Sequence, residues 1–157
     1  RVIRIILIVV MAATLLFIFS NSLKSAEESS EDSAAVSGFL ATIFPTDTTL
    51  GSFVEENVRN IAHFVEHGVF GAEVALYIWF YTEKQRLWAA RSVILGFTVS
   101  FIDESLQYIS DRGPSIADVW IDLSGFVVFS AAMYGVIYAF VCIVRAVKKK
   151  RLEKNNG

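Results

Sequence analysis

Four long apolar runs are the feature that most constrains how this chain folds. They cover residues 2–20, 61–81, 87–109 and 116–144, and each reaches or approaches the roughly 20 residues that a helix needs to cross a bilayer core. Lipid offers no hydrogen-bond partners to exposed N–H and C=O groups, so these runs must be helical. The sequence therefore predicts an all-α bundle of four transmembrane helices, forming a single domain over residues 1–157.

The lysines and arginines predict the orientation of these helices. All but three of the 14 lie at the start of the first run, around the connection between the second and third runs, or after the fourth. The exceptions are Lys24, Arg59 and Arg112. By the positive-inside rule, both termini, including the basic tail at 145–157, lie in the cytoplasm, and the first and third loops face outward.

Other classes of protein fit the sequence less well. The first run also resembles a signal peptide, with Arg1 and Arg4 as its n-region, but it is long and no A-x-A-like cleavage site follows. The formal net charge of −2 does not indicate a nucleic-acid partner. Cys142 is the single cysteine, which excludes an intrachain disulfide and argues against a cysteine metal site.

The first outer loop, residues 21–60, is the only long connection. It begins with AEESSEDS, an acidic, solvated stretch with little capacity to form a core. Residues 34–44 are apolar enough to lie in the membrane interface as a short helix. Ser52 followed by Glu55 has the spacing of a capping box, which predicts a helix that starts there and continues through Arg59 into the second run.

Ionisable residues gather where the second run begins, the third ends and the fourth begins. In an up-down-up-down bundle these three ends lie on the same side. Such residues are costly in lipid and mark a functional site by default. The predicted polar pocket consists of His63, Glu66, Asp103, Glu104, Gln107, Arg112, Asp118 and Asp122.

Helical spacing predicts how these residues are arranged. His63, Glu66 and His67 are spaced i, i+3, i+4 and share one face of a helix. Asp118 and Asp122 are one turn apart, and Gly125 continues their stripe at a position where another backbone could approach closely. Asp111 is expected at the outer rim.

Three kinds of chemistry are compatible with this pattern. HFVEH fits H-x-x-E-H, in which two histidines bind zinc and the glutamate acts as a base. The carboxylates could instead bind Mg²⁺, Mn²⁺ or Ca²⁺, or the residues could form a hydrogen-bond network that fixes helix register. The candidate metal ligands are His63, Glu66, His67 and Asp103, but a polar pocket without a metal is the preferred interpretation.

The order of these motifs resembles the VanZ-like family of membrane proteins. The resemblance covers residues 17–125 and rests on FIFSNS, H-x-x-E, D-E-x-x-Q, a short loop with arginine, and D-x-x-x-D-x-x-G. It implies a bacterial plasma-membrane protein linked to low-level teicoplanin resistance. Its motif positions correspond to His63, Glu66, Asp103, Glu104, Gln107, Arg112, Asp118 and Gly125.

Two positions depart from the family pattern. His67 stands where an aromatic such as tyrosine is usual, and Asp122 stands where asparagine is usual. The first departure favours a hydrogen-bonding role for His67, so His67→Tyr is expected to preserve function.

Two classes of function remain open. In the first, which we favour, the protein is a binding or accessory factor that contacts membrane lipids and recognises a lipid-linked wall precursor, an envelope lipid or a lipophilic glycopeptide. In the second, it is a membrane-embedded hydrolase or transferase, perhaps metal-dependent, in which a carboxylate acts as general base. A covalent acyl-enzyme is disfavoured, because the sequence has neither a G-x-S-x-G motif nor a cysteine outside the last run.

Overall fold

The computed structural model of the chain describes residues 1–110 and 112–155, with side chains through residue 151. Asp111 lies outside the described residues. Within this range the chain is helical, without strands, which confirms the predicted all-α class. The helices are α1 (Val2–Ser22), α2 (Ala26–Ala41), α3 (Thr49–Glu56), α4 (Val58–Tyr81), α5 (Gln85–Ile109) and α6 (Ile116–Asn155).

Each predicted apolar run lies in one long helix. By length and composition, α1 and the Ile116–Arg151 part of α6 are apolar enough to cross a membrane. Helices α4 and α5 have 24 and 25 residues and are long enough to do so, although polar side chains interrupt them. Helix α6 continues past the predicted run and carries most of the basic tail as helix.

The first loop is more helical than the sequence predicted. Helix α2 starts at Ala26, within the acidic stretch, rather than near residue 34. Its start is stabilised by a capping box, in which the Ser25 hydroxyl accepts from the Glu28 N–H at 3.3 Å and the Ser25 N–H donates to the Glu28 carboxylate at 2.9 Å. The same backbone and side-chain bonds from Ser25 lower the pKa of Glu28.

The capping box predicted at Ser52 is wrong. The Ser52 hydroxyl donates to the Thr49 carbonyl, one turn back inside α3. The actual N-cap is Thr48, whose hydroxyl accepts from the Gly51 N–H at 3.0 Å. The backbone leaves helical geometry at Asn57, so α3 and α4 are separate helices rather than one.

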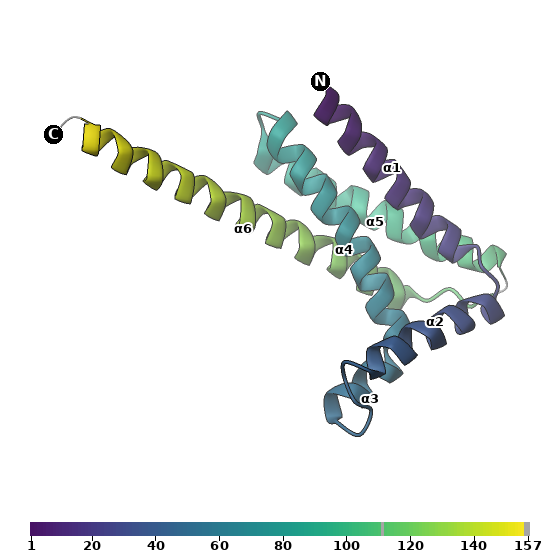
Figure 1. Cartoon of the computed structure of the whole chain (residues 1–157). Helices are drawn as coiled ribbons and strands as arrows, with labels where there is room; N and C mark the ends of the chain where they lie inside the picture. The colour runs from purple at the N-terminus through teal and green to yellow at the C-terminus, as the bar shows by residue number, and fades with distance from the viewer. Residues whose placement is uncertain (111, 156–157) are drawn as a thin grey trace.

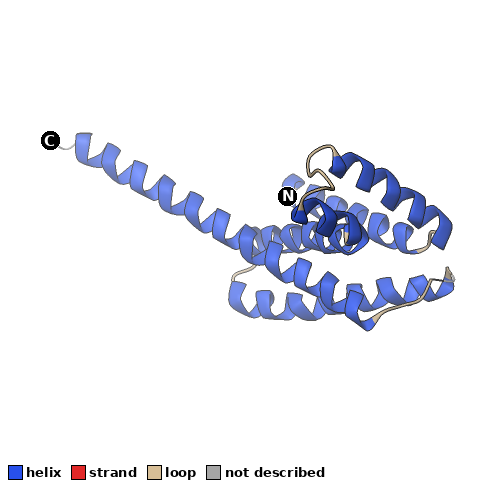
Figure 2. Ribbon diagram, turned by 90° about the horizontal axis from the view of Figure 1, so that it is seen from below, coloured by secondary structure: helices blue, strands red, loops and turns tan. Residues whose placement is uncertain are grey.

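Helix α4 lies at the centre of the arrangement, between α1, α5 and α6 (Figure 1). The N-terminal half of α6 crosses the N-terminal half of α4. The C-terminal half of α6 extends away from the other helices in both views (Figure 1, Figure 2). The buried core is formed by Ile18, Phe70, Val74, Ile78, Val99 and Phe126.

Two glycines allow α4 and α6 to touch backbone to backbone. A Cβ at Gly125 would lie 2.1 Å from the Phe64 carbonyl oxygen, and a Cβ at Gly71 would lie 2.2 Å from the Phe126 carbonyl oxygen. Small residues permit such close approach between membrane helices. The close approach expected at Gly125 is therefore confirmed, and it brings the first turns of α6 against the start of α4.

Candidate functional site

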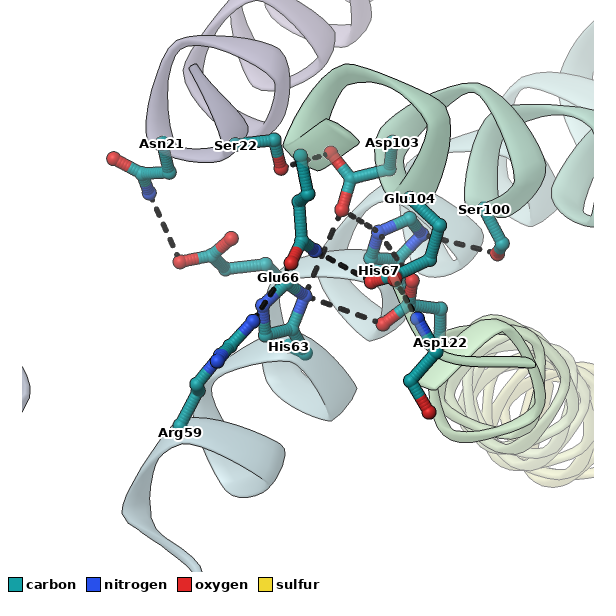
Figure 3. Close-up of polar contacts among 12 residues, drawn as sticks. Asn21, Ser22, Arg59, His63, Glu66, His67, Ser100, Asp103, Glu104 and Asp122 are labelled. Atoms are coloured by element: carbon teal, nitrogen blue, oxygen red, sulfur yellow. Dashed lines mark hydrogen bonds and ion pairs between the residues drawn. The ribbon is translucent and has the colours of Figure 1, made fainter. Parts of the chain in front are cut away.

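Four helix ends meet at one end of the bundle, and the polar residues gather there (Figure 3). The end of α1, the start of α4, the end of α5 and the start of α6 each contribute side chains to this region, which we call the polar mouth. The close α4–α6 crossing places Asp122 beside His63 and His67, in the second and third turns of α4. The start of α4, the end of α5 and the start of α6 thus lie on the same side of the bundle, as the sequence predicted.

Four side chains point their polar atoms toward one another at the centre of the polar mouth. One nitrogen or oxygen from each of His63, His67, Asp103 and Asp122 lies within 4.8 Å of the other three. His63 Nδ1 is 3.6 Å from Asp103 Oδ2 and 3.4 Å from Asp122 Oδ1. His67 Nε2 is 3.5 Å from Asp103 Oδ2 and 3.3 Å from Asp122 Oδ2.

This group of four is buried, and its facing atoms have no hydrogen-bond partner among the described residues. His67, Asp103 and Asp122 are each 0% exposed, and the His63 side chain is 12% exposed. The unpartnered atoms are His63 Nδ1, His67 Nε2, Asp103 Oδ2 and both carboxylate oxygens of Asp122. Buried polar atoms normally have hydrogen-bond partners, so a group of unpartnered atoms in one place requires a physical explanation.

The outer atoms of the same residues are held in place. The Ser22 hydroxyl donates to Asp103 Oδ1 at 2.5 Å, which leaves Oδ2 directed toward the histidines. The Ser100 hydroxyl lies 3.4 Å from His67 Nδ1 and donates to the Gly96 carbonyl at 3.0 Å. Because that hydroxyl hydrogen is used on the carbonyl, the Ser100 oxygen is free to accept from an Nδ1–H of His67.

A second set of contacts connects α4 to the end of α5. Arg59 donates to the Gln107 side-chain oxygen at 2.7 Å, and the Gln107 amide donates to Glu104. The other oxygen of Glu104 accepts from the Ser115 N–H at 2.8 Å. The side chains of Gln107 and Glu104 are therefore hydrogen-bonded to each other, and they join α5 to Arg59 of α4 and to the loop before α6.

A third set joins α1 to the loop after α5. Arg112 donates to the Asn21 carbonyl at 3.2 Å, and the Asn21 side-chain amide donates to Glu66 at 3.1 Å. Burial lowers the pKa of Arg112, and the nearby positive charge of Arg59 lowers it further. Arginine keeps its charge in proteins nonetheless, so two guanidinium cations lie close together at this wall of the polar mouth.

A cavity of about 340 Å³ opens beside these cations, between α1, α2 and α4. His63 and Glu66 reach it from α4, so the cavity borders the group of four. Its cationic side is formed by Arg59 and Arg112, and Lys24 also lines it but is paired with Asp32 at 2.6 Å. Its apolar side is formed by Phe17, Ala35, Val36, Val58 and Ala62.

The structure brings most of the sequence-predicted pocket residues together, but in different roles. His63, Asp103 and Asp122 belong to the group of four, whereas Glu66 lies outside it and faces Asn21. Asp118 is half-buried near Glu104 and Arg112 and makes no side-chain hydrogen bond within the described residues.

Sequence reasoning missed four residues of the polar mouth. Asn21 and Ser22 end the FIFSNS motif, which was a usable signal, but they carry no charge and were not named as pocket residues. Ser100 is also uncharged, and its position depends on the rotation of α5, which an apolar run does not specify. Arg59 carried a usable signal, since it is one of three cations on the predicted outer side and lies one turn before His63.

These features define a helical protein whose polar residues from distant segments meet at one end of a bundle. A family model described as VanZ/LLP1 matches residues 5–141. The chain belongs to this family, as the resemblance in its motifs predicted. No curated protein and no solved structure matches the chain.

Proposed function

We propose that this protein crosses the bacterial plasma membrane four times, with both termini in the cytoplasm and the polar mouth outside. Two apolar helices and the lengths of α4 and α5 support this topology. At the opposite end of the bundle, Arg4 donates to the Tyr77 hydroxyl at 2.9 Å and lies over the rings of Tyr77 and Tyr81. Basic and aromatic side chains together are typical of a cytoplasmic membrane interface.

The polar mouth binds an anionic amphiphile in this proposal. The observation that carries it is the pair of guanidinium groups, Arg59 and Arg112, at the wall of the cavity. Neither forms an ion pair with a carboxylate among the residues that the structure describes, and Arg59 Nε is buried without a partner. Arginines pair with phosphate and carboxylate groups through two parallel hydrogen bonds, so this wall is suited to an anionic head group.

The apolar side of the cavity supports a lipid ligand rather than a free anion. A phosphate on Arg59 and Arg112 would place an attached hydrocarbon chain against Phe17, Val36 and Val58. A lipid-linked component of the cell envelope has this combination of groups. Binding of such a lipid is the role that we propose to underlie the family's link to teicoplanin resistance, with a lipophilic glycopeptide as the competing ligand.

Binding of farnesyl phosphate to purified protein tests this role, with farnesol as the uncharged probe. We expect the phosphate to bind and the alcohol to bind much more weakly. Replacing both arginines, in Arg59→Gln/Arg112→Gln, should weaken binding of the phosphate by about 10²- to 10⁴-fold, because at least two hydrogen bonds are lost and each one to a charged group is worth about 1.5–3 kcal/mol.

The matched control is Arg91→Gln, since Arg91 is exposed and lies over the Trp88 ring at the other end of the bundle. This variant should bind farnesyl phosphate like the wild type. Equal affinity for phosphate and alcohol, or unchanged affinity in the double variant, would contradict the proposal. Binding of teicoplanin alone, without farnesyl phosphate, would favour the glycopeptide.

A metal-dependent hydrolase is the second candidate function, favoured by the position of Glu66 between the cavity and the group of four. In this case Glu66 would take the proton from a water that attacks the terminal phosphorus of a lipid diphosphate, and the P–O–P bond would break with the lipid monophosphate as the leaving group. Release of inorganic phosphate from farnesyl diphosphate, lost in Glu66→Gln, is the expected result. A Glu66→Gln variant with unchanged release, or a wild type without release, would exclude this role.

A further inference from the structure

The geometry points to a site for a divalent transition-metal ion, of which Zn²⁺ is the type, bound by His63, His67, Asp103 and Asp122. This inference goes beyond the binding role proposed above and does not depend on it. The four residues come from α4, α5 and α6, so the ion would join three helices that are distant in the sequence.

The distances between the four donors fit metal coordination better than hydrogen bonding. The four nitrogen–oxygen separations run from 3.3 to 3.6 Å, whereas an N–H···O bond is usually about 2.7–3.2 Å. Ligands at about 2.1 Å from a tetrahedral zinc ion lie about 3.4 Å from one another. The four histidine–aspartate separations are therefore those of ligands around one cation, and one donor atom from each of the four residues lies within 4.8 Å of the other three.

The tautomer of His67 strengthens this inference. If the His67 ring is neutral and its Nδ1–H donates to the Ser100 hydroxyl, Nε2 carries a lone pair, and that lone pair faces Asp103 Oδ2 and Asp122 Oδ2. A lone pair opposed to two carboxylates is repulsive unless a cation lies between them. Ligating histidines commonly bind a metal through one nitrogen and donate a hydrogen bond from the other.

The burial of the carboxylates requires a compensating charge. Asp103 and Asp122 are both 0% exposed, and with both imidazoles in the neutral form that binds metals, the two carboxylates carry two negative charges in a medium that solvates them poorly. A divalent ion would neutralise both. Two imidazole nitrogens favour zinc or another first-row transition metal, because Mg²⁺ and Ca²⁺ take oxygen ligands.

The same geometry changes the role of two residues named from the sequence. Asp122 replaces Glu66 among the candidate ligands, because the Glu66 carboxylate faces Asn21. His67 becomes a ligand rather than a hydrogen-bonding substitute for tyrosine, since its Nε2 has no hydrogen-bond partner among the described residues. His67→Tyr is accordingly expected to lose the metal.

Zinc content of the purified full chain tests the inference without any lipid. After loading with Zn²⁺ and removal of the excess, we expect one zinc per chain by elemental analysis. His67→Tyr and Asp122→Asn should weaken Zn²⁺ binding by more than the roughly 10- to 100-fold that follows loss of an outer hydrogen bond to a ligand. Ser22→Ala removes such an outer bond to Asp103 and should fall within that range.

Two variants serve as controls. Glu66→Gln changes a carboxylate next to the site but outside the group of four, and Arg59→Gln/Arg112→Gln changes the wall proposed to bind the anion. Both should retain one zinc per chain. The arginine variant should lose farnesyl phosphate binding but keep its zinc. The two proposals therefore have separate measurements, and failure of one does not decide the other.

A second measurement uses the wild-type protein alone and therefore does not depend on whether any variant folds. A chelator should lower the melting temperature of the wild-type protein, and added Zn²⁺ should restore it, because the ion binds only the folded arrangement. Wild-type protein without zinc after loading and with a chelator-insensitive melting temperature would overturn the inference. So would zinc retained in full by folded His67→Tyr and Asp122→Asn.

Discussion

Replacing Gly125 by alanine is expected to destabilise the protein substantially, by about 1–3 kcal/mol, the cost of forcing extra atoms into a packed contact. The added methyl group would lie 2.1 Å from the Phe64 carbonyl oxygen, which is backbone and cannot rotate away. Helices α4 and α6 would have to separate. Thermal unfolding in detergent, followed by circular dichroism, measures the loss.

Gly135→Ala is the matched control on the same helix. A Cβ at Gly135 would meet nothing within 4 Å, and alanine is the better helix former. Its melting temperature should equal or exceed that of the wild type. If Gly125→Ala unfolds at the same temperature as Gly135→Ala, the α4–α6 crossing is not a close backbone contact.

Replacing Asp103 by asparagine is expected to abolish a teicoplanin-resistance phenotype in a bacterial host while the protein stays abundant in the membrane. The asparagine is nearly isosteric and can still accept from the Ser22 hydroxyl, which now donates to Asp103 Oδ1 at 2.5 Å. What it removes is the charge of the carboxylate whose Oδ2 faces both histidines. The resistance level and the protein abundance, measured on the same cells, separate the two effects.

Glu73→Gln provides the comparison, because Glu73 is also an acid on α4 but accepts from Thr14 at 2.8 Å, away from the polar mouth. This variant should keep its phenotype. A purely structural network would make abundance and resistance fall together in Asp103→Asn, and that outcome would count against a functional role for the polar mouth.

Much of the architecture could be predicted from the sequence, because the length of each apolar run indicates the length of the helix that contains it. The runs located α1, α4, α5 and the start of α6, and the spacing of Asp118, Asp122 and Gly125 identified the side of α6 that approaches α4. The polar residues at three run ends indicated that one end of the bundle is polar. These inferences depend only on helical periodicity and on the cost of charge in lipid.

The composition of the centre of the site could not be predicted in the same way. His63, Glu66 and His67 share a helix face, yet the rotation of α4 directs the histidines toward α5 and α6 and Glu66 toward α1. Periodicity places residues on a face but does not say which neighbour that face meets. The start of α2 was missed for a local reason, because the Ser25–Glu28 capping box lies in a segment whose composition indicated only solvation.

The proposed role in binding an envelope lipid depends above all on the side of the membrane on which the polar mouth lies. Single cysteines placed by Ser29→Cys in α2 and by Lys84→Cys before α5, each in a Cys142→Ser background, report it through a membrane-impermeant thiol reagent on intact cells. We expect labelling at position 29 from outside, and labelling at position 84 only after the membrane is opened. Labelling at position 29 only after the membrane is opened would contradict an outward-facing site.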